Sequence, residues 1–169
     1  MAQVTLKGTP VKLSGDIPGV NSKGEDFSFV KADMSEVKLS EIKDKIKVLI
    51  AVPSLDTSVC AAETKHFSEK LAGKDNVEAI VISKDLPFAM KRYMENNKIE
   101  NITAASDFRN GGFLKKYNVE MTEGPFKGLS ARAVFVLDKD NTIKYAELVP
   151  EIAHEPEYDK VLKAVDELI

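Results

Sequence analysis

The sequence predicts an α/β sandwich with a mixed central sheet and helices on both faces. Two β-rich stretches, Lys47–Val52 and Val77–Ser83, are largely apolar and have the composition of buried central strands. Between them, apolar residues return at helical spacing from Ser58 to Leu71, which indicates a strand–helix–strand unit with parallel strands. Near the C-terminus, a pair of strands around a short turn adds antiparallel pairing. Together these segments predict the mixed sheet.

The N-terminal part is predicted to begin with a hairpin. Two short strands in residues 4–13 surround the turn Gly8–Pro10. A turn-rich segment follows and ends in an alternating strand, Asp26–Val30. Residues 39–45 are predicted to be a single helical turn or a loop. The first central strand then runs from Lys47 to Val52.

The segment from Ser58 to Leu71 is predicted to be a helix that buries one face. Four residues at i, i+4, i+7 and i+11 form that face: Cys60, Thr64, Phe67 and Leu71. Gly73 follows and is a suitable residue to end the helix.

The second half alternates helices and strands. We expect a helix over 86–97 with Pro87 in its first turn, a short strand over 102–107 and a short helix over 111–118. A loop over 124–132 precedes two antiparallel strands around the turn Asp138–Asn141. The tail from Pro156 is amphipathic, with a stripe formed by Tyr158, Leu162, Val165 and Ile169.

Composition restricts the classes of function. The 169 residues suit one domain, which we expect to span 1–169, and the net charge of −3 favours neither nucleic acid nor an anionic membrane. No stretch approaches the roughly 18 apolar residues of a membrane span, and the N-terminus has no apolar core of a signal peptide. The single cysteine allows no disulfide within the chain, so we expect a cytoplasmic protein.

That cysteine, Cys60, is predicted to lie where a thiolate is stabilised. With Thr57 as N-cap, Cys60 falls in the first helical turn, after a central strand. The helix dipole there contributes roughly 0.3–1 kcal/mol, or about 2 when partly buried. Shifting a thiol's ionisation by two and a half pH units takes roughly 3.4 kcal/mol. A nearby cation is therefore required, and the residues alone leave open whether Cys60 is reactive or simply a small buried hydrophobe.

The residues around Cys60 carry a resemblance to a known family. Pro53, Thr57 and Cys60 have the spacing P-x-x-x-T-x-x-C. This resembles the active-site signature of the peroxiredoxins and, more narrowly, of the bacterial thiol peroxidase subfamily. The resemblance covers essentially the whole chain, through the segments KGTPVKLSGDIP, DTSVCAAETKHF, SKDLPFAMKRY, SDFRNGGFLKKYNV and GPFKGLSARAVFVLD.

The resemblance implies a thioredoxin-like fold with an N-terminal β-hairpin and an activity that reduces hydroperoxides without cofactor or metal. Cys60 would be the peroxidatic cysteine, which attacks the peroxide and becomes a sulfenic acid. Thr57 would hydrogen-bond the thiolate and the peroxide, and Pro53 would shield the thiolate from water. Arg132 matches the family arginine, and it would supply the required cation.

One position departs from the family pattern. Met94 stands where the subfamily usually has a resolving cysteine, and a thioether cannot condense with a sulfenic acid. The sulfenic acid must then be reduced by an external thiol, such as a small thiol, glutaredoxin or thioredoxin. The resemblance also implies a homodimer. Two alternatives remain open: a peroxide-sensing redox relay without multiple turnover, and a paralogue that keeps the fold without activity.

Two further interpretations concern aromatic and histidine residues. Phe88, Phe113 and Phe126 are candidates for an apolar collar that favours alkyl hydroperoxides. A Cys–His hydrolase is disfavoured, because His66 lies six residues after Cys60 and faces roughly the opposite side of the helix. The position of His154 relative to Cys60 is not determined by the sequence.

Overall fold

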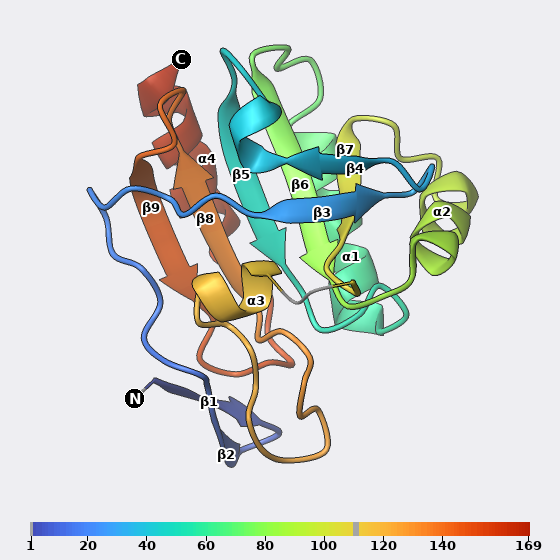
Figure 1. The fold of residues 1–169 in the computed structure, drawn as a ribbon, viewed down its shortest axis with the longest axis vertical. Coiled ribbons are helices and arrows are strands. Elements are labelled where there is room, and N and C mark those ends of the chain that lie inside the picture. Colours follow the sequence, from blue (N-terminus) through green and yellow to red (C-terminus); the bar gives the residue numbers. More distant parts are fainter. Residues whose placement is uncertain (1, 110–111) are drawn as a thin grey trace.

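The computed structural model describes residues 2–109 and 112–169. In these residues, seven strands form one sheet in the order β4-β3-β7-β6-β5-β8-β9, and β1 and β2 form a separate hairpin (Figure 1). The strands are β1 (Gln3–Leu6), β2 (Thr9–Lys12), β3 (Ser28–Lys31), β4 (Glu36–Lys38), β5 (Ile46–Ala51), β6 (Val77–Ser83), β7 (Ile102–Ser106), β8 (Ala133–Leu137) and β9 (Ile143–Leu148). The helices are the 3-10 turn η1 (Leu39–Glu41), α1 (Ser58–Lys70), α2 (Pro87–Asn96), α3 (Gly112–Lys116) and α4 (Tyr158–Leu168).

The sheet is mixed, which confirms the predicted fold class. β5 pairs in parallel with β6, and β6 pairs in parallel with β7. β8 runs antiparallel to β5, and β9 runs antiparallel to β8. All six residues of β5 are buried, as expected for a strand at the centre of a covered sheet, and five of them are apolar.

Helices cover both faces of the sheet (Figure 1). One hydrophobic cluster packs α1, α2 and α4 against the sheet and includes Val48 and Ile50 of β5. A second cluster packs α3 and η1 against the opposite face and includes Leu49 and Ala51. Alternate residues of the same strand thus enter two separate cores, because successive side chains of a strand point to opposite faces. No helix in the described part of the chain has the length and apolar character needed to cross a membrane.

The N-terminal hairpin forms, but its turn differs from the predicted one. Lys7 and Gly8 make the turn, whereas Thr9 and Pro10 already belong to β2. The φ angles of Lys7 and Gly8 are 51° and 85°. A two-residue hairpin loop whose twist matches the strands needs positive φ at both central positions, and proline cannot adopt it.

The structure also differs from the prediction at β4, at the start of α3 and at the end of α4. β4 was not predicted, because its three residues alternate too briefly to give a signal. The predicted start of the short helix at Gly111 lies outside the described residues, and α3 begins at Gly112. In α4 the fully buried residues are Val161 and Val165, whereas Ile169 follows the last helical residue and is 62% exposed. The predicted stripe was therefore wrong at its C-terminal end.

The carboxylate of Glu151 attaches the hairpin to the rest of the chain, beside backbone hydrogen bonds that join Thr5 to Pro150 and Ile152. Its Oε1 accepts hydrogen bonds from Thr5 Oγ1 and the Gly8 N–H, both at 2.9 Å. Its Oε2 accepts from the N–H groups of Ala153 at 2.9 Å and Lys7 at 3.1 Å. The N–H groups of Ala153 and Gly8 contribute most to lowering the pKa of Glu151, to about 2.

We expect the attachment of the hairpin through Glu151 to weaken at low pH. A carboxyl group with a lowered folded pKa stabilises the fold above its ordinary pKa of 4.5 and loses that effect as pH falls toward 2. Thermal unfolding of Glu151→Gln and wild type should therefore differ most at neutral pH and converge over that interval. Glu123, which accepts one N–H bond from Lys12, is the matched control, and Glu123→Gln should give a smaller difference. A difference for Glu151→Gln that is constant from pH 7 to pH 2 would contradict this account.

Candidate active site

Cys60 is the third residue of α1 and lies just beyond the end of the central strand β5. Its side chain is fully buried. The other residues of the predicted helical face, Thr64, Phe67 and Leu71, are buried with it. The predicted position of the thiol, in the first turn of a helix after a central strand, is confirmed.

Arg132 brings a cation to this thiol. It directly precedes β8, which pairs with β5 so that Ala133 lies opposite Ala51. This register carries Arg132 to the end of β5 at which α1 begins. Its Nη1 lies 3.2 Å from Cys60 Sγ, and its Nε donates a 2.9 Å hydrogen bond to the Ile152 carbonyl. The guanidinium is 2% exposed, so little water screens its charge.

Glu63 is a site residue that the sequence analysis missed. Its Oε2 accepts a 2.6 Å hydrogen bond from Arg132 Nη1, the same nitrogen that contacts Cys60. Burial raises the pKa of Glu63 to about 7, although the charge of Arg132 opposes this rise. Burial lowers the pKa of Arg132, but the neighbouring Glu63 and Cys60 outweigh that effect and raise it overall. The available signal was a glutamate three residues after the cysteine, next to the buried helical face.

Thr57 occupies the predicted N-cap position, but its side chain does not cap the helix. Its backbone is extended, with φ −90° and ψ 147°, and no hydrogen bond joins its side chain to the first helical turn. Its Oγ1 instead donates a 3.0 Å hydrogen bond to the Ser54 carbonyl. The predicted N-cap position is therefore confirmed, while the Thr57 hydroxyl bonds to the loop before the helix and not to the helix itself. Pro53 is buried between β5 and this loop.

A cavity of about 270 Å³ adjoins these residues. Pro53, Thr57 and Arg132 line it, so the structure brings these three predicted residues together beside Cys60. The remaining wall is mostly apolar and comes from distant parts of the chain: Leu6, Lys7, Ser58, Val59, Phe126, Ile152 and Ala153. The hairpin held by Glu151 thus supplies one side of the cavity.

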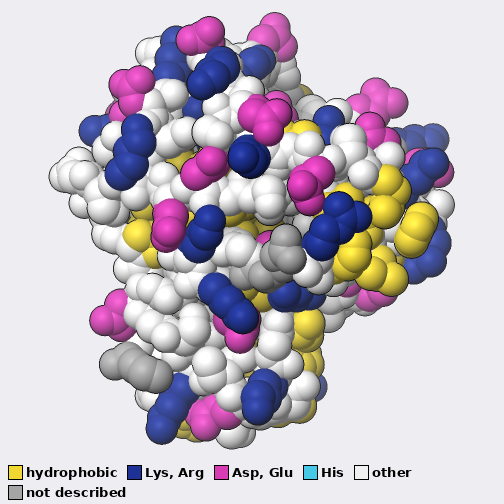
Figure 2. Space-filling model, viewed as in Figure 1, with side chains coloured by type: hydrophobic (Ala, Val, Ile, Leu, Met, Phe, Trp, Pro, Cys, Tyr) yellow, Lys and Arg dark blue, Asp and Glu magenta, His cyan; other side chains and the backbone are white. Residues whose placement is uncertain are grey.

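The predicted collar of three phenylalanines does not form. Phe126 lines the cavity. Phe113 is fully buried in the cluster on the opposite face of the sheet. Phe88 is 67% exposed on α2, and Leu86 just before this helix is 53% exposed. Figure 2 shows apolar side chains gathered at the position that α2 occupies in Figure 1. Only one of the three rings therefore borders the site.

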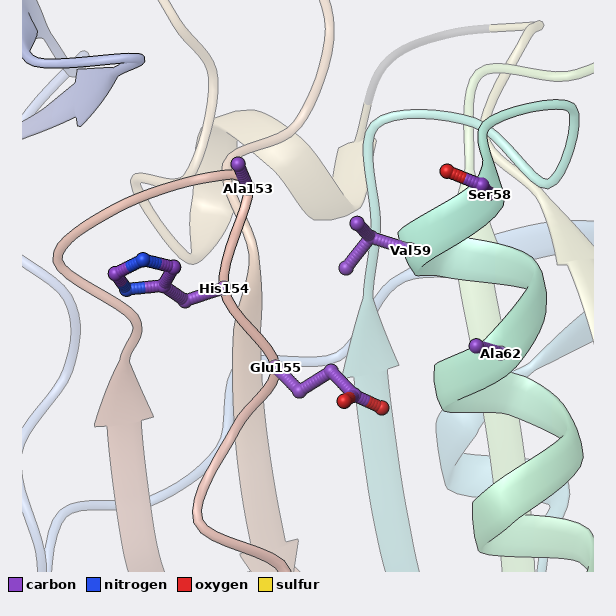
Figure 3. Close-up of a pocket in the computed structure, with 6 residues that line it drawn as sticks. All are labelled: Ser58, Val59, Ala62, Ala153, His154 and Glu155. Atoms are coloured by element: carbon purple, nitrogen blue, oxygen red, sulfur yellow. The ribbon is translucent and has the colours of Figure 1, made fainter.

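A second, open pocket lies between the start of α1 and the loop after β9 (Figure 3). Its lining includes Val59, Ala62 and His154, and the His154 ring points away from α1 in Figure 3. His66 stacks on Tyr158, with ring centroids 4.0 Å apart. Among the described residues, neither histidine hydrogen-bonds Cys60, which agrees with the expectation against a Cys–His hydrolase.

The arrangement can stabilise a thiolate. Opposite charges 3.2 Å apart attract by about 5 kcal/mol at an effective dielectric constant of about 20. Burial and the competing carboxylate of Glu63 reduce that gross value. Before these reductions the attraction exceeds the roughly 2 kcal/mol that a helix dipole supplies at most, so Arg132 is the larger of the two favourable charges at the sulfur.

Comparisons with known proteins agree with this geometry. Residues 19–162 match the Redoxin family. The chain is 51% identical over 168 residues to a thiol peroxidase of Leptospira interrogans and 48% identical over 166 residues to one of Aquifex aeolicus. Each alignment covers 98% of both chains.

Solved structures show the same relationship. A peroxiredoxin-like protein from Aquifex aeolicus superimposes with a TM-score of 0.95 at 47% identity, covering 100% of this chain and 98% of that one. A thiol peroxidase from Chromobacterium violaceum has the same fold, with a TM-score of 0.90 at 22% identity over 98% and 95% of the two chains. The chain belongs to the redoxin family, and within it to the thiol peroxidases, which are thiol-dependent peroxidases of the peroxiredoxin type.

Proposed function

We propose that Cys60 is the peroxidatic cysteine of this peroxidase and that Arg132, Thr57 and Pro53 assist it. The observation that carries the proposal is the 3.2 Å contact between Arg132 Nη1 and Cys60 Sγ at the apolar cavity. The thiolate attacks one oxygen of a hydroperoxide, and the O–O bond breaks. The sulfur keeps one oxygen as a sulfenic acid, and the other oxygen leaves as an alcohol or water after taking a proton.

Each supporting residue has a defined task in this step. Arg132 stabilises the thiolate and the negative charge that develops on the departing oxygen. The Thr57 hydroxyl, whose single proton is donated to the Ser54 carbonyl, keeps a free lone pair that accepts a hydrogen bond from the peroxide. Pro53 has no N–H and keeps water away from the sulfur.

The sulfenic acid is then reduced by an external thiol. Met94, at the position of the usual resolving cysteine, is 8% exposed and belongs to the same core cluster as Cys60. Its thioether has no S–H with which to form a disulfide. A small thiol, glutaredoxin or thioredoxin is the reductant that this requires.

The same features support proposals on the domain, the compartment and the oligomeric state. We propose that residues 1–169 form one domain that acts in the cytoplasm as a homodimer. A lone thiol that must be regenerated suits a reducing compartment. The exposed Leu86 and Phe88 supply apolar surface for a second copy.

Turnover distinguishes an enzyme from a redox relay. Reduced protein is mixed with one equivalent of cumene hydroperoxide, and Cys60 is followed by intact mass with a sulfenate trap. Excess peroxide is then added with glutathione, with glutaredoxin and glutathione, or with a thioredoxin system. Many peroxide molecules consumed per protein with one of these reductants would establish the peroxidase cycle. Oxidation that stops after one event with all of them would instead favour the relay, and oxidation no faster than that of a free thiol would refute both.

Restoring a cysteine at position 94 is expected to change the oxidised product. Met94→Cys should convert the sulfenic acid of Cys60 into an intramolecular disulfide, because position 94 corresponds to the family's resolving cysteine and lies in the same core cluster as Cys60. Intact mass after one equivalent of peroxide should show the loss of two hydrogens instead of the gain of one oxygen. Met90→Cys, on the same buried face of α2 one turn earlier, is the matched control and should give less disulfide. Persistence of the sulfenic acid in Met94→Cys would refute the proposed correspondence of this position.

A further inference from the structure

The carboxylate of Asp85 joins the sheet to the loop that precedes Cys60. Asp85 lies between β6 and α2. Its Oδ1 accepts a 2.7 Å hydrogen bond from Ser54 Oγ, and its Oδ2 accepts a 2.8 Å bond from the Leu55 N–H. On the sheet side, Ser83 Oγ donates to Oδ2 at 2.8 Å, and Ser106 Oγ donates to the Asp85 carbonyl. Asp85 is thus hydrogen-bonded to the ends of β6 and β7 and, on its other side, to Ser54 and Leu55 of the loop.

Within the loop, Ser54 connects Asp85 to Thr57 through hydrogen bonds. The Ser54 carbonyl accepts hydrogen bonds from both the N–H and the Oγ1 of Thr57, at 3.2 and 3.0 Å. The Asp56 N–H donates to Ser54 Oγ at 3.1 Å. The position of the Thr57 hydroxyl beside the cavity therefore depends on Ser54, and the position of Ser54 depends on Asp85.

The loop also packs beside Cys60, because Leu55 belongs to the same core cluster. Cys60 is fully buried, and Pro53 and Leu55 are buried with it. A hydroperoxide is small enough to enter through the cavity. An external thiol must bring its own sulfur into line with the S–O bond of the sulfenic acid. This second reaction therefore needs the loop and the first turn of α1 to move apart from β6.

We propose that Asp85 is a positioning residue that keeps the loop from Pro53 to Thr57 closed, which favours the peroxide step and restrains the thiol step. The inference rests on the proposed function, because it assumes that Cys60 reacts first with peroxide and then with an external thiol. In the first step the Cys60 thiolate takes one oxygen, and the alcohol departs with a proton. In the second step the external thiol displaces that oxygen as water and forms a mixed disulfide with Cys60. A second thiol then releases Cys60 and leaves as a disulfide with the first.

Replacing Asp85 should slow the peroxide step and accelerate the thiol step. Charge-assisted bonds to a carboxylate are stronger than bonds between neutral groups. Replacing Asp85 with asparagine keeps the size of the side chain but presents an N–H₂ group to at least one of its N–H or O–H donors. The loop then opens more often. Thr57 is held less well for the peroxide step, and the sulfenic acid is exposed more often to thiols.

Two rate constants of the full-length protein test the proposal. The first is oxidation of reduced Cys60 by cumene hydroperoxide in a single turnover, and the second is reaction of the preformed sulfenic acid with glutathione. In Asp85→Asn we expect the first to fall about tenfold and the second to rise severalfold. Alkylation of reduced Cys60 by iodoacetamide should also accelerate. Asp138 is the matched control, because its carboxylate also organises a loop, by accepting hydrogen bonds from the N–H groups of Asp140 and Thr142 in the turn of the β8–β9 hairpin. Asp138→Asn should change neither rate by more than about twofold.

The outcomes separate this inference from the function on which it rests. If wild-type Cys60 is not oxidised rapidly, the proposed function fails. If the wild type reacts but both rates are unchanged in Asp85→Asn, or both fall together, the positioning role is refuted. If Asp85→Asn does not fold, Ser54→Ala takes its place, because it removes one of the two hydrogen bonds between the loop and Asp85. Ser54→Ala must then slow the oxidation of Cys60 and accelerate the reaction of its sulfenic acid with glutathione, each by less than expected for Asp85→Asn. Equal effects of Ser54→Ala on both steps would overturn the proposal.

Discussion

Replacing Cys60 with serine is expected to reduce peroxide consumption to the uncatalysed background, a loss of about 10⁴-fold or more. A hydroxyl is hardly ionised at neutral pH, and the serine oxygen is far less nucleophilic than a thiolate. Cys60 is the only cysteine of the chain, so no other thiol can replace it. The substitution is small, and the fully buried site should still fold. Peroxide consumption with a thiol reductant, measured at several protein concentrations, gives the loss directly.

A matched variant on the same helix tests whether the loss is local. Ser68 lies two turns further along α1, where its Oγ donates to Asn101. Ser68→Ala should retain the wild-type rate. The thermal midpoints of both variants show whether the helix is intact. Peroxidase activity that persists in Cys60→Ser above the rate of the reductant alone would exclude Cys60 as the nucleophile.

Replacing Arg132 with methionine is expected to slow the oxidation of Cys60 and to lower the stability of the fold. The rate of Cys60 oxidation should fall by about 10²–10³-fold, because the larger of the favourable charges at the thiolate and the developing oxyanion is removed. Stability should fall by about 3–5 kcal/mol, because Glu63 is left buried without its partner. Stopped-flow oxidation and denaturant unfolding measure the two effects separately.

A double variant separates catalysis from folding. In Arg132→Met with Glu63→Leu, apolar side chains replace the whole buried ion pair, and such replacements are often neutral or stabilising. We expect the double variant to recover much of the lost stability while oxidation of Cys60 stays slow. Recovery of the oxidation rate together with stability would show that Arg132 acts only through the fold.

The pH dependence of stability offers an independent check on Glu63. Its folded pKa of about 7 lies above the ordinary value of 4.5, so the folded protein binds this proton more tightly than the unfolded chain. The contribution of Glu63 to stability is therefore present below pH 4.5 and lost as pH rises toward 7. The double variant should lack this decline. An identical pH profile in wild type and double variant would contradict the buried state of this carboxyl group.

The central strands and the helix that carries Cys60 were predictable because local patterns determine them. β6 has the predicted bounds, and β5 and α1 differ by a residue at one or both ends. Strands buried on both faces need unbroken apolar runs, and a helix with one buried face needs the 3.6-residue repeat. Where the local pattern was short, prediction failed, as with β4 and with the turn at Lys7 and Gly8.

The candidate site was predictable only in part. The spacing of Pro53, Thr57 and Cys60 is a local signature, and the resemblance added Arg132. Glu63 and Asp85 were missed because each has the sequence context of an ordinary surface acid. The place of Glu63 three residues after Cys60 is a weak signal, and its contact with Arg132 becomes visible only in the structure. The same holds for the bonds of Asp85 to Ser54 and Leu55.

The sequence by itself determined that a lone cysteine lies in the first turn of a helix after a buried central strand. It also determined, through Met94, that no second thiol of the chain can react with Cys60. Only the tertiary structure decided what surrounds the sulfur. The pairing of β8 with β5 brings Arg132 to Cys60 across 72 positions, and the pairing of β5 with β6 places Asp85 beside the loop. The physical reason is that strand pairing joins distant segments through backbone hydrogen bonds, which leave no periodic mark on the side chains that they bring together.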